Sequence, residues 1–448
     1  MSRVRPRFLL APLTLAVAFL LSFSTPAWAS RLDTDVIVGT PASSGGFAEA
    51  DRPDIEAKAA IVVGQDGTVY FERDADTELN IASLTKVMTA IVALEHASLD
   101  DTVTVDHAAA TVGQSSADLK EGDTMPLSTA LKALLMTSGN DAAMAIATTV
   151  GAKIDSSSND PYQTFVDAMN AKAKELGMEH TLFANPHGLD FDGWEADMHS
   201  TARDVATMFS YAMKNDDFRS IDADADNVIT VTGADGERRS ITILDRNLLR
   251  GQDGNIAGKT GGTYIALSCY VGAFKKDLGG EIYTVTLGSS DDNQRWADTR
   301  TISSWYYNHM VAYPVATTSR TATDGSPLMA RATNEAWSDR TVDVTVEDPT
   351  ATVSLFSLAG TVEETASLKR VDGGVNRGDD MGTLTIEQAG RELATVKLVA
   401  AEDQAGPNPI EWLLVNIDRI ARFFTGESGS AAGEEFFEVP KATDLDAV

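Results

Sequence analysis

The chain has 448 residues, and 66 Asp and Glu residues outnumber 36 Lys and Arg residues, which gives a formal net charge of −30. A chain of this length has room for two or three domains of about 100–200 residues each, and its acidity argues against a nucleic-acid partner and against broad attraction to anionic lipid. The single cysteine, Cys269, excludes a disulfide framework and a cysteine-based metal site. Its apolar surroundings predict a buried, inert thiol.

The N-terminus has the pattern of an export signal. Three arginines precede the apolar run 8–23, and a small-x-small triplet follows at 27–29. The run is shorter than the ~20 apolar residues of a typical membrane span, so residues 1–29 are predicted to be a signal peptide that is cleaved before Ser30. The protein is therefore expected to be exported, to the cell wall or the outer face of the cytoplasmic membrane. Residues 30–55, rich in Gly, Ser and Ala, are predicted to be a disordered lead-in.

In residues 56–313, sequence patterns typical of strands occur near both ends, and patterns typical of helices lie between them. Alternating apolar residues predict strands at 60–63, 68–71, 228–232, 240–244, 264–274 and 282–287. Apolar residues at helical spacing predict helices at 81–94, 128–135, 141–150 and 162–176, from Thr201 onward, and at 295–309. This order predicts an α+β domain over residues 56–313 rather than a doubly wound fold.

The first motif with chemical meaning lies near the start of the helix at 81–94. Ser83 and Lys86 are three residues apart, so on a helix they share a face. A serine hydroxyl needs a neighbouring base to become a nucleophile, and a lysine can act as that base only if its pKa is lowered. The spacing is common by chance, however, and alone it fits a helix-start serine beside a surface lysine better than an active site.

Two further triplets change that balance. Ser138-Gly139-Asn140 occupies the break between two predicted helices, and Lys259-Thr260-Gly261 stands just before the predicted strand 264–274. Each triplet alone could be an ordinary turn. A Ser-x-x-Lys, a Ser-x-Asn and a Lys-Thr-Gly in this order form the set that penicillin-interacting serine enzymes use.

The neighbouring sequence extends the likeness. Five segments carry it, at 81–90, 134–147, 185–189, 199–205 and 247–249. Together with the triplets they make residues 56–309 resemble the serine-type D-alanyl-D-alanine carboxypeptidases, the low-molecular-mass penicillin-binding proteins. The resemblance implies their transpeptidase fold, shared with β-lactamases: an antiparallel sheet with flanking helices and a helical subdomain. One position departs from the family, because Gly262 stands where a larger residue such as His or Tyr is usual.

The resemblance also implies a reaction. The enzyme would remove the terminal D-Ala from peptidoglycan stem pentapeptides through an acyl-enzyme on Ser83, and penicillin and other β-lactam antibiotics would bind and inhibit it. Lys86 would be the base, Ser138 would relay a proton to the leaving amine, and Asn140 would hold Lys86 and the substrate amide. No metal or cofactor is expected.

Substrate binding would fall to the third triplet. Lys259 and Thr260 would bind the terminal carboxylate, and the charge of Lys259 would help to keep Lys86 neutral. The backbone N–H groups of Ser83 and Gly262 would form the oxyanion hole. Arg295 is a weaker candidate for supporting the bound carboxylate.

Short strand patterns follow a polar linker at 317–326. The predicted strands are at 341–346, 351–355, 382–386 and 393–399. They resemble the small β-sandwich-like domain that often follows the carboxypeptidase domain in this family, here over residues 327–402. Such a domain would hold the catalytic domain off the membrane, engage the wall, or only stabilise the protein.

The last predicted element is an amphipathic helix at 408–424. The resemblance suggests a peripheral membrane anchor, although the helix is too short to span and carries as many acidic as basic residues, unlike a strong interfacial helix. Packing on the β domain is an equal alternative. The acidic tail, residues 425–448, is predicted to be disordered.

Two other functions stay open at this point. A β-lactamase shares the three motifs, but class A enzymes rely on a loop glutamate for deacylation, and the loop 183–199 offers only Glu195. A non-catalytic wall-binding protein that keeps the fold is the other alternative. Rapid turnover of penicillin would indicate the first; the second would be expected to have lost the motif residues, and all three motifs are intact.

Overall fold

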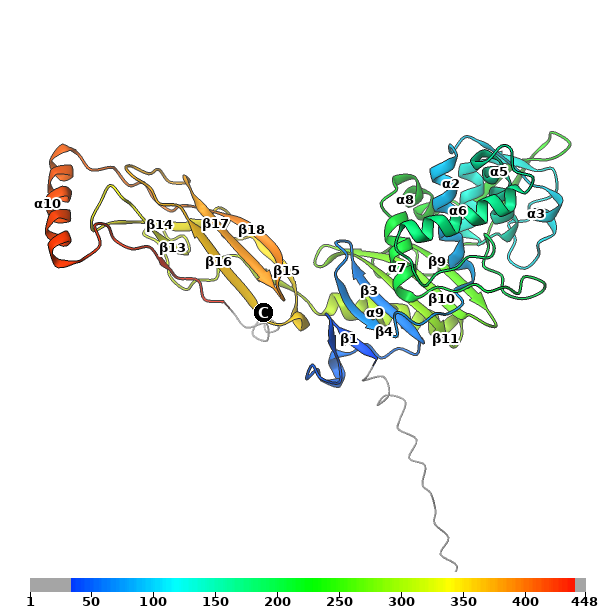
Figure 1. The fold of residues 1–448 in the computed structure, drawn as a ribbon, viewed down its shortest axis with the longest axis horizontal. Coiled ribbons are helices and arrows are strands. Elements are labelled where there is room, and N and C mark those ends of the chain that lie inside the picture. Colours follow the sequence, from blue (N-terminus) through cyan, green and yellow to red (C-terminus); the bar gives the residue numbers. More distant parts are fainter. Residues whose placement is uncertain (1–33, 440–448) are drawn as a thin grey trace, which may run out of the picture.

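The structure is a computed structural model, and it describes residues 34–439. Figure 1 shows an elongated molecule in which a mixed α/β domain is followed by a narrower all-β domain, with helix α10 (Pro409–Thr425) at the far end. The predicted signal peptide lies outside the described residues. Within residues 34–439, no helix is both long and apolar enough to cross a bilayer.

A seven-stranded antiparallel sheet forms the centre of the first domain. Its strand order is β2-β1-β4-β3-β11-β10-β9, with Val285 opposite Ile61 and Val271 opposite Lys259. The strands are β1 (Asp35–Ile37), β2 (Thr40–Pro41), β3 (Ala59–Gly64), β4 (Val69–Arg73), β9 (Asn255–Thr263), β10 (Leu267–Lys276) and β11 (Gly280–Ser289).

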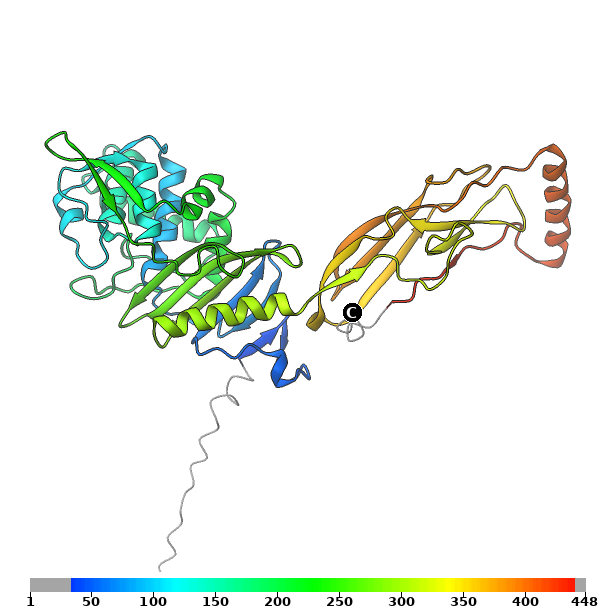
Figure 2. The same cartoon turned by 180° about the vertical axis from the view of Figure 1, so that it is seen from behind.

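Helices cover both faces of this sheet. Helix α9 (Asp292–Asn308) lies along one face, seen in front in Figure 2, and the other helices gather on the opposite side. They are α2 (Thr85–His96), α3 (His107–Thr111), α4 (Leu127–Met136), α5 (Asn140–Ile154), α6 (Pro161–Glu175), α7 (Ala202–Ala212) and α8 (Asp216–Ala223).

Helix α2 is the centre of this helical group. Every residue from 85 to 93 is buried, as expected for a helix with neighbours on all sides rather than a surface helix with one apolar stripe. A small four-stranded sheet stands beside the helices. It contains β5 (Thr102–Thr104), β6 (Thr124–Pro126), β7 (Val228–Thr232) and β8 (Arg238–Thr242).

Two predictions about this domain are wrong. The Lys-Thr-Gly triplet was expected just before a strand that starts at Tyr264, but it lies inside β9, and Tyr264 belongs to the turn between β9 and β10. Glycine has low strand propensity and no side chain to reveal alternation, so the glycine-rich sequence of β9 concealed the strand.

The predicted disorder of 30–55 is also wrong for the residues from 34 onward. Strand β1 pairs with β4, and Ile37 and Ile55 are buried. The carboxylate of Asp35 accepts two hydrogen bonds from the Arg73 guanidinium, at 2.6 and 2.8 Å. A contact across 38 positions leaves no local signal, so the polar composition gave the wrong answer.

The second domain is built from β-strands, as the sequence pattern of residues 327–402 predicts. A six-stranded sheet has the order β16-β17-β18-β14-β13-β19, and β12 pairs with β15 in a separate two-stranded sheet. The strands are β12 (Met310–Pro314), β13 (Ala330–Thr333), β14 (Thr341–Val346), β15 (Thr352–Phe356), β16 (Val362–Leu368), β17 (Asp380–Gln388), β18 (Arg391–Ala400) and β19 (Glu434–Glu435).

The two domains meet at an aromatic junction. Phe356, at the end of β15, is buried among rings of the first domain, with centroids 5.0 Å from Tyr70, 5.3 Å from Trp305 and 5.8 Å from Tyr306. Arg391, at the start of β18, donates to the Thr68 hydroxyl at 2.6 Å.

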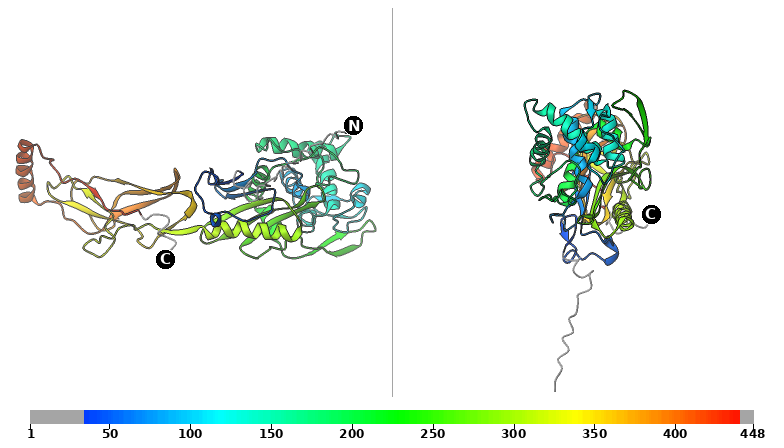
Figure 3. Two further views of the ribbon diagram at one scale, coloured as in Figure 1. Left: turned by 90° about the horizontal axis from the view of Figure 1, so that it is seen from below. Right: turned by 90° about the vertical axis from the view of Figure 1, so that its right-hand side faces the viewer.

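The amphipathic helix at the end of the chain touches the β domain only along one edge, where Arg419 donates to the Glu335 carbonyl and Val415 is buried. Helix α10 stands at the tip of the molecule (Figure 3), and most of its apolar side chains are exposed, among them Phe423 and Phe424 at 80% each. The apolar face of the helix is therefore left largely uncovered by the β domain. Disorder of the tail 425–448 is wrong for its described part, because β19 pairs with β13 and Phe436 is buried; residues 440–448 lie outside the described range.

Candidate active site

Ser83 sits in a short 3-10 turn, η2 (Ala82–Leu84), that leads directly into α2. The preceding residue, Ala82, has a φ of 48°, a left-handed conformation that costs a non-glycine residue about 1–2 kcal/mol. Gly188 packs so closely on this turn that a Cβ there would lie 1.9 Å from the Ala82 carbonyl oxygen. A neighbouring loop therefore holds the candidate nucleophile in a tight, strained turn.

Lys86 is fully buried, and its Nζ contacts three oxygen atoms. It lies 2.7 Å from Asn140 Oδ1, 2.8 Å from the His187 carbonyl oxygen and 2.9 Å from Ser83 Oγ. The Asn140 Nδ2 donates to the Gly113 carbonyl at 3.0 Å, so Oδ1 must face Lys86. A neutral amine has two hydrogens for these two obligate acceptors and one lone pair for the Ser83 hydroxyl proton. This is the geometry that a general base requires.

The electrostatics of the site favour the neutral amine. The pKa of Lys86 is held well below its ordinary value, mainly by burial and next by the charge of Lys259, while Asp141 acts in the opposite direction. The charge of Lys259 lowers the pKa of Lys86, as expected from the sequence, but burial lowers it more. Burial disfavours any charge on the amine, and the charge of Lys259 disfavours a second ammonium beside it.

The second triplet is presented by a strained loop. Ser138 has a φ of 63°, and the Asn140 N–H donates to the Ser115 carbonyl at 2.8 Å. The buried carboxylate of Asp141 accepts from the Ala117 N–H at 2.9 Å and also receives the Ser116 hydroxyl at 2.6 Å. These contacts fix the loop 115–119 against the start of α5, so that the serine and the asparagine project into the site.

Lys259 reaches the same place from β9. Its buried Nζ lies 2.8 Å from Ser138 Oγ and 2.7 Å from the Thr260 carbonyl oxygen. Burial lowers the pKa of Lys259 to about 7; the charges of Arg295 and Arg246 add to this lowering, and the carboxylate of Asp222 opposes it. At neutral pH, Lys259 is thus close to the point where it gains or loses its charge.

A cleft of ≈ 670 Å³ opens over these groups. Its lining includes Ser83, Ser138, Thr260, Gly262, Arg246 and Arg295. Two guanidinium groups line it in a chain with a net charge of −30, and the buried Lys259 lies directly behind Ser138, so the cleft is suited to a small anion such as a carboxylate. The buried Arg295 also donates to the Gly261 carbonyl at 3.1 Å.

Gly261 and Gly262 have different structural roles. A Cβ on Gly261 would lie 2.6 Å from the Ile81 carbonyl oxygen, so glycine is required for β9 to approach the Ser83 turn. On Gly262 the closest atoms would be the Leu267 carbonyl oxygen at 3.7 Å and Arg295 at 3.9 Å, which are ordinary contacts. Glycine at this second position widens the cleft without being demanded by the backbone.

Sequence reasoning missed several groups in this cleft. Arg246, Gln114 and Ser115 line it, and the carbonyl of His187 accepts from Lys86. The only signal for His187 was the segment 185–189, which contributed to the resemblance without an assigned role. A backbone carbonyl is invisible in sequence, and the loop residues reach the cleft through tertiary contacts.

The structure also bears on Glu195, the glutamate that a β-lactamase would need. Glu195 is exposed, its carboxylate accepts from the Gly193 N–H at 2.9 Å, and it is absent from the residues that line the cleft. The loop therefore provides no deacylating base there.

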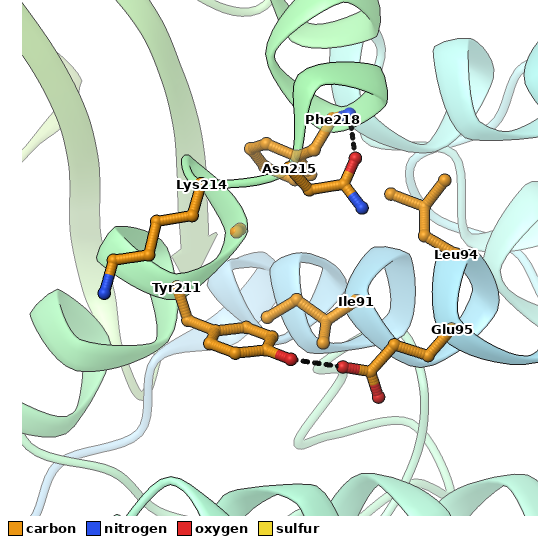
Figure 4. A pocket seen from close by; sticks show the side chains of 8 residues that line it. Ile91, Leu94, Glu95, Tyr211, Lys214, Asn215 and Phe218 are labelled. Carbon is orange, nitrogen blue, oxygen red and sulfur yellow. Dashed lines mark hydrogen bonds between the residues drawn. The ribbon is translucent and has the colours of Figure 1, made fainter.

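A second hollow, of ≈ 250 Å³, lies at the other end of α2 (Figure 4). Tyr211 donates to the Glu95 carboxylate at 2.6 Å at its edge, while Ile91, Leu94 and Phe218 form apolar walls. Its lining residues include no serine or cysteine nucleophile, so this hollow is no rival to the cleft at Ser83.

The fold and the cleft define a penicillin-binding-protein-like serine hydrolase. A family model described as D-alanyl-D-alanine carboxypeptidase matches residues 47–291, and the chain belongs to that family. It is a serine-type D-Ala-D-Ala carboxypeptidase, and these comparisons support that function rather than a β-lactamase or a non-catalytic wall protein.

Individual relatives agree with this assignment. The chain is 25% identical over 359 residues to the D-alanyl-D-alanine carboxypeptidase DacF of Bacillus subtilis, covering 78% of this chain and 86% of the relative. It is 34% identical to DacB2 of Mycobacterium tuberculosis, over 49% and 71% of the two chains. A solved mutant of the Streptomyces K15 DD-transpeptidase superposes with a TM-score of 0.53 at 29% identity, covering 57% of this chain and 98% of that chain.

Proposed function

We propose that Ser83 is the nucleophile and Lys86 the base of this carboxypeptidase. The observation that carries the proposal is the contact of 2.9 Å between Lys86 Nζ and Ser83 Oγ, with the other two contacts of the amine taken by obligate acceptors. The Ser83 oxygen would attack the carbonyl carbon of the penultimate D-Ala while its proton passes to Lys86. The N–H groups of Ser83 and Gly262 would stabilise the oxyanion, each by a few kcal/mol.

The leaving group then needs a proton. When the tetrahedral intermediate collapses, the C–N bond breaks, and the proton held by Lys86 reaches the departing amine through the Ser138 hydroxyl. Free D-Ala leaves, and the stem stays as an ester on Ser83. Water attacks this ester, Lys86 takes the water proton and returns it to Ser83, and the shortened stem is released with a free carboxylate.

The substrate is held by its charged end. Lys259 and Thr260 bind the carboxylate of the terminal D-Ala, with Arg295 and Arg246 nearby in the cleft. One Nδ2 hydrogen of Asn140 is taken by the Gly113 carbonyl, and the other would meet the substrate amide. A penicillin carries a comparable carboxylate beside a reactive amide, so it acylates Ser83 in the same way and inhibits the enzyme.

The test uses a fluorescent penicillin and a stem pentapeptide. The wild-type protein should be labelled covalently and should release free D-Ala from the peptide, whereas Ser83→Ala should do neither while keeping its circular dichroism spectrum. Labelling that survives in the variant would show that another residue is acylated.

Two segments near the ends of the chain bear on where the enzyme acts. We propose that residues 1–29 direct export and that the enzyme acts outside the cytoplasm, on peptidoglycan. Helix α10 supports a peripheral membrane contact, because it presents exposed Ile, Leu, Trp and Phe side chains at the end of the molecule farthest from the catalytic domain. Fractionation of cells that produce the full chain, followed by N-terminal sequencing of the mature protein, tests both points.

A further inference from the structure

Asp190 is a buried carboxylate beside the active site with no role in the reaction described above. It is 3% exposed. Its Oδ2 accepts two hydrogen bonds, from Asn80 Nδ2 at 2.9 Å and from the Thr263 hydroxyl at 3.0 Å. Asn80 lies three positions before Ser83, and Thr263 directly follows Gly262. One oxygen atom therefore joins the two chain segments that carry the proposed oxyanion donors.

The loop that carries this carboxylate is rigid. Residues 185–190 are all buried. The Asn185 Oδ1 accepts from the His187 and Gly188 N–H groups at 3.2 and 2.6 Å, and its Nδ2 donates to the Leu189 carbonyl at 2.9 Å. Gly188 also packs directly against the Ala82 carbonyl. The loop therefore contacts the Ser83 turn, and this contact fixes the position of Asp190.

Thr263 passes this constraint on to the end of β9. Its hydroxyl donates to Asp190 and accepts from the Ala266 N–H at 3.0 Å. The same side chain thus ties the turn between β9 and β10 to the loop. Loss of the hydroxyl would free the segment that holds the Gly262 N–H.

The second oxygen of Asp190 makes the arrangement informative. Oδ1 is buried and has no hydrogen-bond partner among residues 34–439. Leaving a buried polar atom unpaired is unfavourable. The buried position of Asp190 therefore leaves one carboxylate oxygen unpaired. What the position provides is the pair of hydrogen bonds that Oδ2 accepts from Asn80 and Thr263.

We propose that Asp190 is a positioning residue, which holds the Ser83 turn and the Gly262 end of β9 at the spacing that the oxyanion needs. This inference rests on the proposed function, since that function assigns the two N–H donors. Oxyanion donors act mainly on the transition state. Loosening them should therefore slow acylation without weakening the initial binding of the ligand.

The decisive comparison is between Thr263→Val and Thr263→Ser. Valine has nearly the same shape but no hydroxyl, whereas serine keeps the hydroxyl. Stopped-flow acylation by a fluorescent penicillin over a range of concentrations separates the binding constant from the acylation rate constant. Thr263→Val should lower the rate constant roughly tenfold and leave the binding constant nearly unchanged, and Thr263→Ser should recover most of the rate.

Asp190→Ala removes the hydrogen bond between Thr263 and Asp190 from its other side. It should slow acylation at least as much as Thr263→Val, and because the two variants share the loss of one hydrogen bond, the defect of the double variant should be well below the product of the two single defects, with only the contact from the Ala266 N–H lost in addition. The labelled fraction at saturation counts the folded, active molecules, so a general loss of structure is separated from a slower step. If Asp190→Ala does not fold, the Thr263 pair alone decides.

The inference is overturned if Thr263→Val is acylated at the wild-type rate, or if its whole defect lies in the binding constant or in the labelled fraction. Failure of the proposed function looks different, because Ser83→Ala would then retain the label whatever happens at Thr263.

Discussion

Lys259 Nζ lies 2.8 Å from Ser138 Oγ, so a titratable cation is in direct contact with the hydroxyl that is proposed to relay a proton. Burial lowers the pKa of Lys259 to about 7, and Lys259 in turn lowers the pKa of Lys86. The two lysines therefore titrate as neighbours, and the pH dependence of acylation reports on both.

The acidic limb of that dependence belongs to Lys86, which works only when neutral. Loss of the Lys259 charge should raise the pKa of Lys86, so Lys259→Gln should move the acidic limb to higher pH. Lys259→Arg keeps the charge and should leave the limb near its original pH, even if binding suffers. Penicillin acylation rates against pH check this for the three proteins, and an identical limb in all of them would show that Lys259 does not tune Lys86.

The basic limb belongs to Lys259 in the free enzyme. Below about pH 7 the ammonium is charged and attracts the substrate carboxylate, and as pH rises through about 7 that attraction is lost. The value of kcat/KM, which reports on the free enzyme, should fall over this range. Arginine stays charged, so in Lys259→Arg the fall should disappear from the neutral range. A wild-type profile that stays flat from pH 6 to 9 would contradict the prediction.

Substitution of Asp222 provides an independent way to shift the basic limb of the kcat/KM profile. It is buried on α8, its Oδ2 accepts from the Gly258 N–H at 2.7 Å, and its charge raises the pKa of Lys259. Asp222→Asn keeps an acceptor for Gly258 but removes the charge, so the pKa of Lys259 should fall and the basic limb should move to lower pH. The acidic limb serves as the internal reference, and a shift of the basic limb to higher pH would contradict the assignment.

The two glycines of β9 provide a steric test. Gly261→Ala places a Cβ 2.6 Å from the Ile81 carbonyl oxygen, so it should lower the free energy of unfolding by roughly 1–3 kcal/mol and slow acylation. Gly262→Ala meets only contacts at 3.7 Å and beyond, so its stability should stay within about 0.5 kcal/mol of wild type. Chemical denaturation of both variants checks this, and equal losses would refute the steric account.

The sequence predicted those parts of the fold that have a local pattern. The buried run of α2 and the cap of α7, where the Thr201 hydroxyl accepts from the Asp204 N–H at 3.0 Å, can be recognised from a few neighbouring residues. The three triplets were recognisable in the same way. The structure places Lys86 against Ser83 and Lys259 against Ser138, and the two serines line one cleft.

The missed features all depend on distant partners. Asp35 is ordered by Arg73, Asp190 by Thr263, and Phe436 is buried in a tail whose composition suggests disorder. Single-residue composition carries no record of such contacts. Strand β9 was missed for a second reason, since its glycines serve close backbone approach rather than strand propensity.

Helix α10 leads to the last prediction, which concerns membrane contact. Deleting residues 407–448 would also remove the buried Phe436 and strand β19, so a change in location could reflect damage to the β domain. Substitution of exposed side chains avoids this, and Ile417, Ile420 and Phe424 are 55%, 60% and 80% exposed. The triple variant with serine at all three positions should keep its thermal stability because none of the three is in the core.

Vesicle sedimentation then measures the contact. The wild-type protein should sediment with phosphatidylcholine vesicles, because burying apolar surface contributes roughly 25 cal/mol per Å², and the triple variant should stay in the supernatant. Adding anionic lipid should change little, since the helix carries as many acidic as basic residues. The catalytic domain is at the other end of the molecule, so penicillin labelling should be equal in both proteins. A wild-type protein that does not sediment with either vesicle would refute the membrane contact.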